Sequence, residues 1–237
     1  MVATSVLITG FEPFGGHKVN PSQLVAESFE GRLIAGRPLR ACVLPVVTDK
    51  VAAELKAALE RGQPDIVICM GQAGGTTGIA VERVAVNVLE LKEPDNAGVL
   101  RSAAAIVTGG PDARLSTLPF KDIVAAWAEN GIPGFLSNSA GTFVCNQVLY
   151  HALGFAEQCS PPFVAGFVHV PYLPEQAALE GAERTPSMSL DVMKAAVEIL
   201  ITTVVAWLEQ RALDSTTSVT VPGFAQTSGH TVKEVER

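Results

Sequence analysis

Residues 66–75 decide the fold: they read Ile66-Val67-Ile68-Cys69-Met70 and then Gly71-Gln72-Ala73-Gly74-Gly75. The first five are apolar without interruption, and Pro64 and Gly71 bound the run. Such a short apolar run is typical of a central strand in a parallel sheet, because helices cover that strand on both faces. The glycines that follow predict a loop at the carboxyl end of the strand.

Short β-branched runs alternate with helical patterns on both sides of this strand. This alternation predicts an α/β fold, a single three-layer domain with a mostly parallel twisted sheet flanked by helices. We expect further strands over residues 6–9, 39–45, 80–88, 134–137 and 163–168. We expect helices over residues 21–33, 48–61, 120–130, 144–154 and 189–211. Residues 92–111 read as a long irregular connection, which in a compact domain is more often functional than idle.

The composition describes a chain with a large buried core. Of its 237 residues 48% are hydrophobic and 17% are charged, against about 25% charged in an average globular domain. After Leu213 the composition shifts to Ser, Thr and Gly. We therefore expect one domain over residues 1–213 and a flexible tail over residues 214–237.

Charge and hydropathy exclude two classes of partner. With 17 basic and 24 acidic residues the net charge is −7, so nucleic acid is not expected as a partner. The longest strongly apolar stretch, residues 199–208, is about half of the roughly 20 residues that a membrane span needs. Since the N-terminus also has no basic region followed by a long apolar one, we expect a cytoplasmic protein without membrane partners.

The cysteines and histidines do not form a metal-binding pattern. The cysteines lie far apart without CxxC spacing and are expected to be free thiols: Cys42, Cys69, Cys145 and Cys159. The histidines are not grouped with them at ligand spacing: His17, His151, His169 and His230. We therefore expect no metal site.

Three loops at strand ends are candidates for a site, because open α/β sheets bind ligands outside the carboxyl ends of their strands. They cover residues 10–20, 71–78 and 138–143, and the third leads directly into Cys145. Cys145 falls in the first turn of an expected helix, where free N–H groups and the helix dipole favour a thiolate. The alternative, a small buried hydrophobe, is our preferred interpretation for the other three cysteines.

A thiolate nucleophile needs a proton-shuttling partner, usually histidine. His151 is six residues from Cys145, so it points about 240° around the helix, away from the thiol. His169 follows the strand over residues 163–168 and falls at the carboxyl end of the sheet, which favours it as the base. A histidine in this place can also simply cap a loop.

Glu82 is the candidate that would orient His169. It lies in a strand that is nearly free of charge, where an isolated carboxylate would be costly unless it is paired or solvated. An internal ion pair with Arg83 or Arg101 is the open alternative.

Loop aromatic residues suggest an apolar pocket for a small ring, namely Phe11, Phe14 and Phe143. Ordinary core packing is the alternative for at least one of them. The glycine loop over residues 71–78 has no Lys-Ser/Thr after its last glycine and does not match a phosphate-binding P-loop. A phosphorolytic or nucleoside-handling enzyme and a non-catalytic small-molecule binding domain stay open as rival functions.

Four blocks resemble the pyroglutamyl-peptidase I family, also called pyrrolidone-carboxylate peptidase. They read Thr9-Gly10-Phe11-Glu12-Pro13-Phe14-Gly15-Gly16 with Asn20-Pro21-Ser22; Glu82-Arg83-Val84-Ala85-Val86-Asn87-Val88; Ser137-Asn138-Ser139-Ala140-Gly141-Thr142-Phe143-Val144-Cys145-Asn146; and His169-Val170-Pro171-Tyr172-Leu173-Pro174-Glu175-Gln176. The resemblance runs in order from about residue 6 to residue 211.

The resemblance implies a cytosolic cysteine exopeptidase that releases an N-terminal pyroglutamyl residue from peptides without a cofactor. It implies Cys145 as the nucleophile, His169 as base and acid, and Glu82 as the residue that orients His169. The family's lactam pocket falls on Phe11, Phe14, Phe143, Asn20 and Gln72. The resemblance also implies homo-oligomers, often tetramers.

The chain departs from the family pattern between residues 87 and 94. Lys92 stands where the family usually carries arginine, which keeps the charge but loses the planar guanidinium. Glu93 stands where the family often has an apolar pocket residue. We expect these departures to affect the shape of the pocket more than the chemistry.

Overall fold

The computed structural model describes residues 5–179 and 184–217 of the chain. Its strands are β1 (Val6–Phe11), β2 (Leu33–Ile34), β3 (Arg37–Leu44), β4 (Ile66–Gln72), β5 (Ile79–Glu82), β6 (Val84–Val86), β7 (Ala113–Leu115), β8 (Gly134–Ser137) and β9 (Val164–Val170). Its helices are α1 (Pro21–Glu27), α2 (Val51–Gly62), α3 (Phe120–Glu129), α4 (Val144–Gln158), α5 (Pro174–Leu179) and α6 (Leu190–Thr217).

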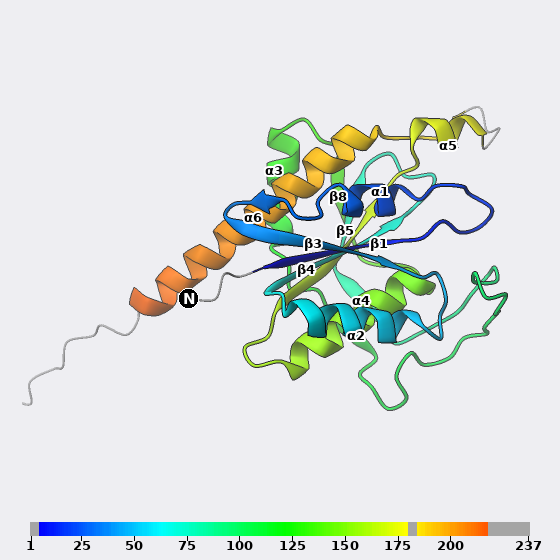
Figure 1. The fold of residues 1–237 in the computed structure, drawn as a ribbon, viewed down its shortest axis with the longest axis horizontal. Helices are drawn as coiled ribbons and strands as arrows, with labels where there is room; N and C mark the ends of the chain where they lie inside the picture. The colour runs from blue at the N-terminus through cyan, green and yellow to red at the C-terminus, as the bar shows by residue number, and fades with distance from the viewer. Residues whose placement is uncertain (1–4, 180–183, 218–237) are drawn as a thin grey trace, which may run out of the picture.

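Seven strands form one sheet in the order β2-β3-β1-β4-β9-β5-β8. The pairs β1/β3, β1/β4, β4/β9 and β5/β8 are parallel, whereas β2/β3 and β5/β9 are antiparallel. Helices α1, α3 and α6 lie on one face, and α2 and α4 lie on the other (Figure 1). The expected three-layer α/β fold with a mostly parallel sheet is confirmed.

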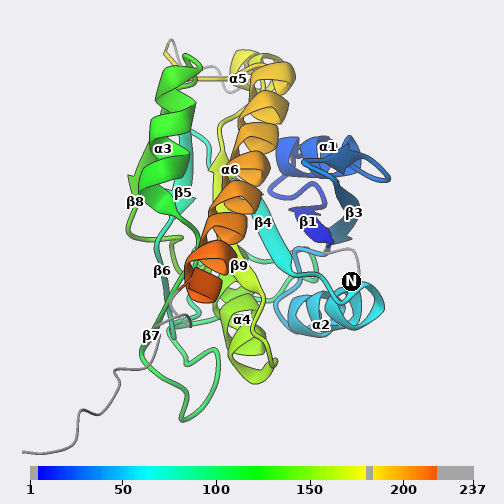
Figure 2. The same ribbon diagram turned by 90° about the vertical axis from the view of Figure 1, so that its left-hand side faces the viewer.

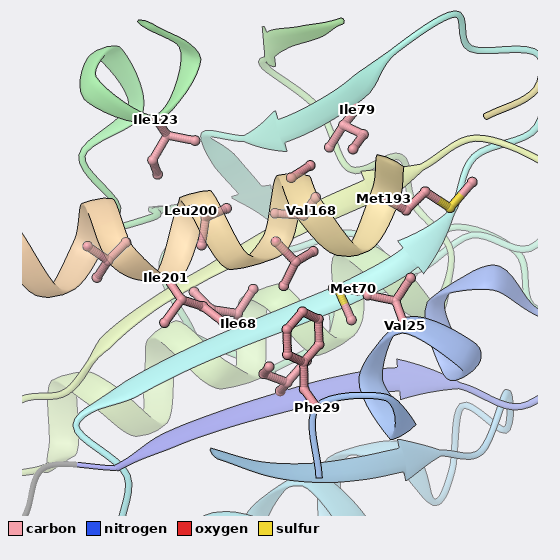
Figure 3. Close-up of a cluster of buried hydrophobic side chains, with 14 of the residues drawn as sticks. Val25, Phe29, Ile68, Met70, Ile79, Ile123, Val168, Met193, Leu200 and Ile201 are labelled. Carbon is pink, nitrogen blue, oxygen red and sulfur yellow. The ribbon is translucent and has the colours of Figure 1, made fainter. Parts of the chain in front are cut away.

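The central strands β4 and β9 are buried along their whole length. Successive side chains of a strand point to opposite faces, so each strand feeds two cores. Ile68 and Met70 of β4 face the core under α1 and α6, as Figure 3 shows. Val67 and Cys69 face the core under α2 and α4. The uninterrupted apolar run therefore reflects burial from both sides.

Helix α6 is the longest element and covers the first of these cores. Its inward face carries Met193, Val197, Leu200 and Val204, each fully buried. Helix α3 lies beside it (Figure 2), and the indole Nε1 of Trp127 donates a hydrogen bond to a carbonyl of α6 at 2.8 Å. This bond satisfies a polar group that would be costly to bury alone.

The expected helix over residues 21–33 is too long. Helix α1 ends at Glu27, Phe29 is buried just beyond it, and Leu33 lies in β2 with 70% of its surface exposed. Gly31 and Gly36 have φ values of 72° and 73°, which glycine adopts at little cost. The turns at these two glycines reverse the chain. The apolar residues that we assigned to one helix through Leu33 therefore belong partly to α1 and partly to the hairpin that follows it.

The expected strand over residues 80–88 is two strands. It divides at Arg83, whose N–H donates to the carbonyl of Ser137 at 2.9 Å and whose carbonyl accepts from the N–H of Ser116 at 2.9 Å. Strand β5 stays in the main sheet, and β6 pairs with β7 outside it. The chain changes its pairing partners at Arg83, and these partners lie in segments that are distant in sequence.

Helix α2 begins at Val51, three residues after the expected start at residue 48. The N-cap position is Lys50, which provides no side-chain cap. The Thr48 hydroxyl instead donates to the Asp95 carboxylate at 3.0 Å, and the Thr48 N–H donates to it at 2.9 Å. A contact with the long connection therefore replaces the local cap.

Helix α6 continues to Thr217, past the boundary that we placed at Leu213. The rest of the expected tail, residues 218–237, lies outside the described residues, and the division into a domain and a flexible tail stays a prediction. None of the helices in the described part of the chain is long and apolar enough to span a membrane.

Candidate active site

The carboxyl ends of the central strands bring two of the predicted loops together. Strands β4 and β9 run parallel with Gly71 opposite His169. A Cβ atom added at Gly71 would lie 2.8 Å from Cys145 Sγ, so the thiol rests directly against the β4 backbone. The sheet edge thus places the cysteine and the histidine next to each other.

Cys145 is the second residue of α4, as the sequence predicts. The N-cap residue Phe143 is extended, with φ −90° and ψ −164°, and contributes no side-chain cap within the described structure. The first N–H groups of an α-helix have no intrahelical partner and carry the positive end of its dipole. Cys145 therefore lies where a negative charge on sulfur, or on an oxygen beside it, is favoured.

His169 joins Cys145 to Glu82. Its side chain lies close enough to Cys145 for the thiol to raise the pKa of the imidazole, and its Nδ1 lies 2.8 Å from Oε1 of Glu82. With Glu82 at Nδ1, Nε2 is the ring nitrogen available to the thiol. Ala80 of β5 pairs with His169, and Glu82 pairs with Phe167 of β9. Glu82 is therefore a diagonal neighbour of His169 on the same face of the sheet.

Buried His169 and Glu82 and half-buried Cys145 interact electrostatically. Burial by itself lowers the pKa of His169, but the charges and hydrogen bonds of Cys145 and Glu82 outweigh it and raise this pKa to about 9. His169 is 8% exposed and Glu82 is 2% exposed. The raised pKa favours the protonated imidazolium of His169 beside these two side chains, although burial alone opposes its charge.

The alternative ion pairs for Glu82 are absent from the described structure. Arg101 bonds to Asp49 and lies 3.3 Å from the Thr48 hydroxyl. Arg83 is exposed and makes no ion pair with any described residue. Glu82 Oε2 has no hydrogen-bond partner within the described residues. The side-chain contact of Glu82 in the described structure is therefore with His169.

The other cysteine and histidine candidates lie away from this group of three side chains. Burial raises the pKa of the Cys69 thiol to about 12, which leaves it an unreactive core residue. His151 stacks on Phe155 with ring centroids 5.8 Å apart, and burial lowers its pKa. His230 lies outside the described residues. Among residues 5–179 and 184–217, no group of three His, Cys, Asp or Glu side chains is arranged to hold a metal ion.

A small cavity next to the thiol contains every pocket residue that we predicted. Its walls are mostly apolar, and Cys145 stands at one side. It is lined by Phe11, Phe14, Asn20, Val46, Gln72, Phe143, Val144 and Cys145. Sequence reasoning missed Val46 and Val144, although the first directly follows a strand and the second precedes Cys145.

The two amides of this cavity differ in what they have left to offer. Asn20 Oδ1 accepts from the N–H and the hydroxyl of Ser22 at 3.0 and 2.8 Å, and its Nδ2 donates to the carbonyl of Glu12 at 3.1 Å. Asn20 is therefore occupied as the N-cap of α1. Gln72 accepts one hydrogen bond from Gln176 at 2.8 Å.

A larger cavity of about 790 Å³ continues from the small one and shares Phe14 and Gln72 with it. Its lining includes Lys18, Glu93 and Glu175. Glu93, which we expected to affect the small pocket, faces this larger space instead. Lys92 is exposed and lines neither cavity.

The long connection over residues 92–111 is anchored beside the cavities. Burial raises the pKa of Asp95, but hydrogen bonds from Thr48, Val99 and Ala97 outweigh it, so this pKa lies below its ordinary value. Asn96 Nδ2 donates to Glu12 Oε1 at 2.8 Å. These contacts hold the segment that carries Glu93 against the loop over residues 10–20.

The fold and this site define a class of protein, an α/β protein that holds a cysteine, a histidine and a glutamate together at a helix N-terminus. A sequence model described as pyroglutamyl peptidase matches residues 4–207. The chain therefore belongs to the pyroglutamyl peptidase family, and the resemblance stated from its motifs is confirmed. Members of this family are peptidases, so the protein is a hydrolase.

Relatives with curated names agree with this family. A pyrrolidone-carboxylate peptidase of Klebsiella pneumoniae is 47% identical over 196 residues, covering 83% of this chain and 90% of the relative. One of Pyrococcus furiosus is 42% identical over 202 residues, covering 83% and 97%. A crystal structure of pyrrolidone carboxyl peptidase from Pyrococcus furiosus superposes with a TM-score of 0.84 at 40% identity, covering 86% of this chain and all of the other.

Proposed function

We propose that this protein cleaves the amide bond after an N-terminal pyroglutamyl residue of a peptide, with Cys145 as the nucleophile. One observation carries the proposal: Cys145 contacts the His169–Glu82 pair on one side and the small, mostly apolar cavity on the other. Family membership supports the substrate, since the relatives are named for it.

The lining of the small cavity suits an uncharged ring, although at a volume of about 10 Å³ its walls must move apart before a ring enters. Phe14 and Phe143 stand with ring centroids 6.1 Å apart, and Phe11 lines the same space. A pyroglutamyl N-terminus carries no ammonium, so it can enter among these rings with amide contacts from Gln72. An ordinary charged N-terminus would lose its hydration without gaining a counter-charge.

The reaction balances with these groups and one water. The Cys145 thiolate attacks the carbonyl carbon, and N–H groups at the start of α4 stabilise the oxyanion. The proton on His169 Nε2 passes to the leaving amine as the C–N bond breaks, leaving a thioester. His169 then takes a proton from water as the hydroxide attacks, the C–S bond breaks, and pyroglutamate leaves. Glu82 holds the imidazole in place throughout.

The larger cavity is the space that we assign to the rest of the peptide. Phe14 and Gln72 line both cavities. A peptide that places its pyroglutamyl ring in the small cavity therefore continues past these two residues into the larger one. Glu93 and Glu175 set two carboxylates against the single ammonium of Lys18 there. The balance favours peptides whose second or third residue is basic.

We also place the protein in the cytoplasm, because its chemistry needs a reduced Cys145 and its three other cysteines are free as well. A homotetramer is the assembly that we propose from the family resemblance. Light scattering coupled to gel filtration measures it directly, and a mass of one subunit would contradict it.

The test is hydrolysis of a fluorogenic pyroglutamyl amide by the wild type, Cys145→Ser and His169→Ala. We expect each substitution to lower kcat by about 10⁴-fold or more, because the members of such a unit act together. Cys159→Ser changes an exposed cysteine and serves as the matched control with unchanged rates. Equal rates in all four proteins would end the peptidase proposal, and phosphate-dependent turnover would favour the phosphorolytic rival.

A further inference from the structure

A second buried amide, Gln176, lies next to Gln72 and lines the larger cavity. Gln176, at the third position of α5, is 3% exposed, and Gln72, at the end of β4, is 9% exposed. Gln176 Nε2 donates to Gln72 Oε1 at 2.8 Å. The two residues are 104 positions apart in the sequence, and nothing in the mechanism so far uses Gln176.

The backbone around Gln176 fixes which way its amide points. Its Oε1 accepts from the N–H of Leu173 at 3.0 Å, and its Nε2 also donates to the carbonyl of Val19 at 3.2 Å. A backbone N–H can only donate and a backbone carbonyl can only accept, so a flipped amide would face both groups with the wrong atom. These two backbone contacts therefore allow only one orientation of the Gln176 amide.

This orientation is passed on to Gln72. One N–H of Gln176 Nε2 donates to the carbonyl of Val19, and the other donates to Gln72 Oε1. The side-chain oxygen of Gln72 is therefore already occupied as an acceptor. No hydrogen bond within the described part of the chain uses Nε2 of Gln72, and Gln72 lines the small cavity beside Cys145. Gln72 therefore has its N–H donors left for a ligand in the two cavities that it lines.

We propose that Gln176 is a positioning residue that sets the hydrogen-bond polarity of the pocket through Gln72. A pocket with this polarity selects a ring that carries an acceptor, such as the lactam carbonyl oxygen of pyroglutamate. It rejects a ring that has only apolar atoms or a donor at that place, because the Gln72 N–H groups would stay unpaired. This inference rests on the proposed function and names the group of the substrate that Gln72 reads.

The test compares two substrates in Gln176→Met, Gln72→Met and the double variant. One substrate is the pyroglutamyl amide, and the other is the cyclopentanecarbonyl amide, an uncharged ring of similar size that lacks both the lactam carbonyl and the lactam N–H. In Gln176→Met we expect kcat/KM for the pyroglutamyl amide to fall by about 10- to 100-fold, mainly through KM. The value for the cyclopentanecarbonyl amide should stay within about threefold of wild type. A merely structural role would lower both values together.

The double variant shows whether Gln176 acts through Gln72. We expect it to be no worse than Gln72→Met alone, because residues in one network are not additive. Gln210→Met, an exposed glutamine of α6, is the matched control. Losses that multiply in the double variant, or an unchanged ratio between the two substrates in Gln176→Met, would overturn the inference. A wild type without Cys145-dependent hydrolysis would instead remove the proposed function itself.

Discussion

At the scale of single residues, the site depends on His169, whose positive charge is stabilised by two neighbouring side chains. The pKa of His169 is raised to about 9 although burial alone would lower it, because Cys145 and Glu82 stabilise the imidazolium. When the pH rises above 6.5, the ordinary pKa of histidine, His169 therefore stays protonated until the pH approaches 9. The stabilisation from this pKa shift is complete below pH 6.5 and is lost as the pH rises through about 9.

Glu82→Gln tests this coupling. The amide keeps the shape and an acceptor but removes the negative charge, so we expect the pKa of His169 to fall and kcat/KM to drop by about 100-fold or more. In the wild type, kcat/KM should decline as the pH rises through about 9, and in Glu82→Gln this decline should begin at lower pH. Glu60→Gln, on the exposed face of α2, is the control. A decline at the same pH in wild type and Glu82→Gln would contradict the coupling.

At the scale of elements, the site requires that helix α4 approach strand β4 closely. Gly71 permits this approach, since a Cβ there would lie 2.8 Å from Cys145 Sγ and 2.9 Å from Cζ of Phe167. Both distances are shorter than side chains tolerate. The glycine after the apolar run of β4 thus allows Cys145 to pack against the strand, whereas the sequence suggested only a loop.

Gly71→Ala is expected to move Cys145 out of line with His169. We expect kcat/KM to fall by about 100-fold, since small displacements of reacting groups have effects of this size. The free energy of unfolding should fall by about 1–3 kcal/mol from overpacking. In Gly62→Ala the new Cβ would lie no closer than 3.8 Å to Pro64 and 4.0 Å to Arg40, so its kinetics should match wild type. Equal activity in both variants would show that the contact at Gly71 is not needed.

At the scale of the whole molecule, the sheet separates two cores with different duties. Cys145 packs against the core under α2 and α4 and is not among the residues packed against the core under α1, α3 and α6. Stability and catalysis can therefore be altered separately. The sheet transmits support to the site through β4 and β9, which belong to both cores.

Leu200→Ala tests this separation, because Leu200 is fully buried in the core under α1, α3 and α6 (Figure 3). We expect the free energy of unfolding, measured by urea denaturation, to fall by about 2–5 kcal/mol. The kcat of the folded fraction should stay within about twofold of wild type. Leu213→Ala, at a position of the same helix that is 63% exposed, should change stability by less than about 0.5 kcal/mol. A large change in kcat for Leu200→Ala would show that the two cores are coupled.

The sequence by itself determined the three-layer fold, the identity of the central strand and the position of Cys145 at a helix start. These features depend on the spacing of apolar residues and on the signals at helix ends, and each segment carries both in its own residues. Only the tertiary structure decided that Glu82 pairs with His169 and not with an arginine, that one expected strand divides at Arg83, and that Gln176 reaches Gln72. Such contacts depend on the register of segments far apart in the chain, and that register is set by the packing and hydrogen bonding of all of them together.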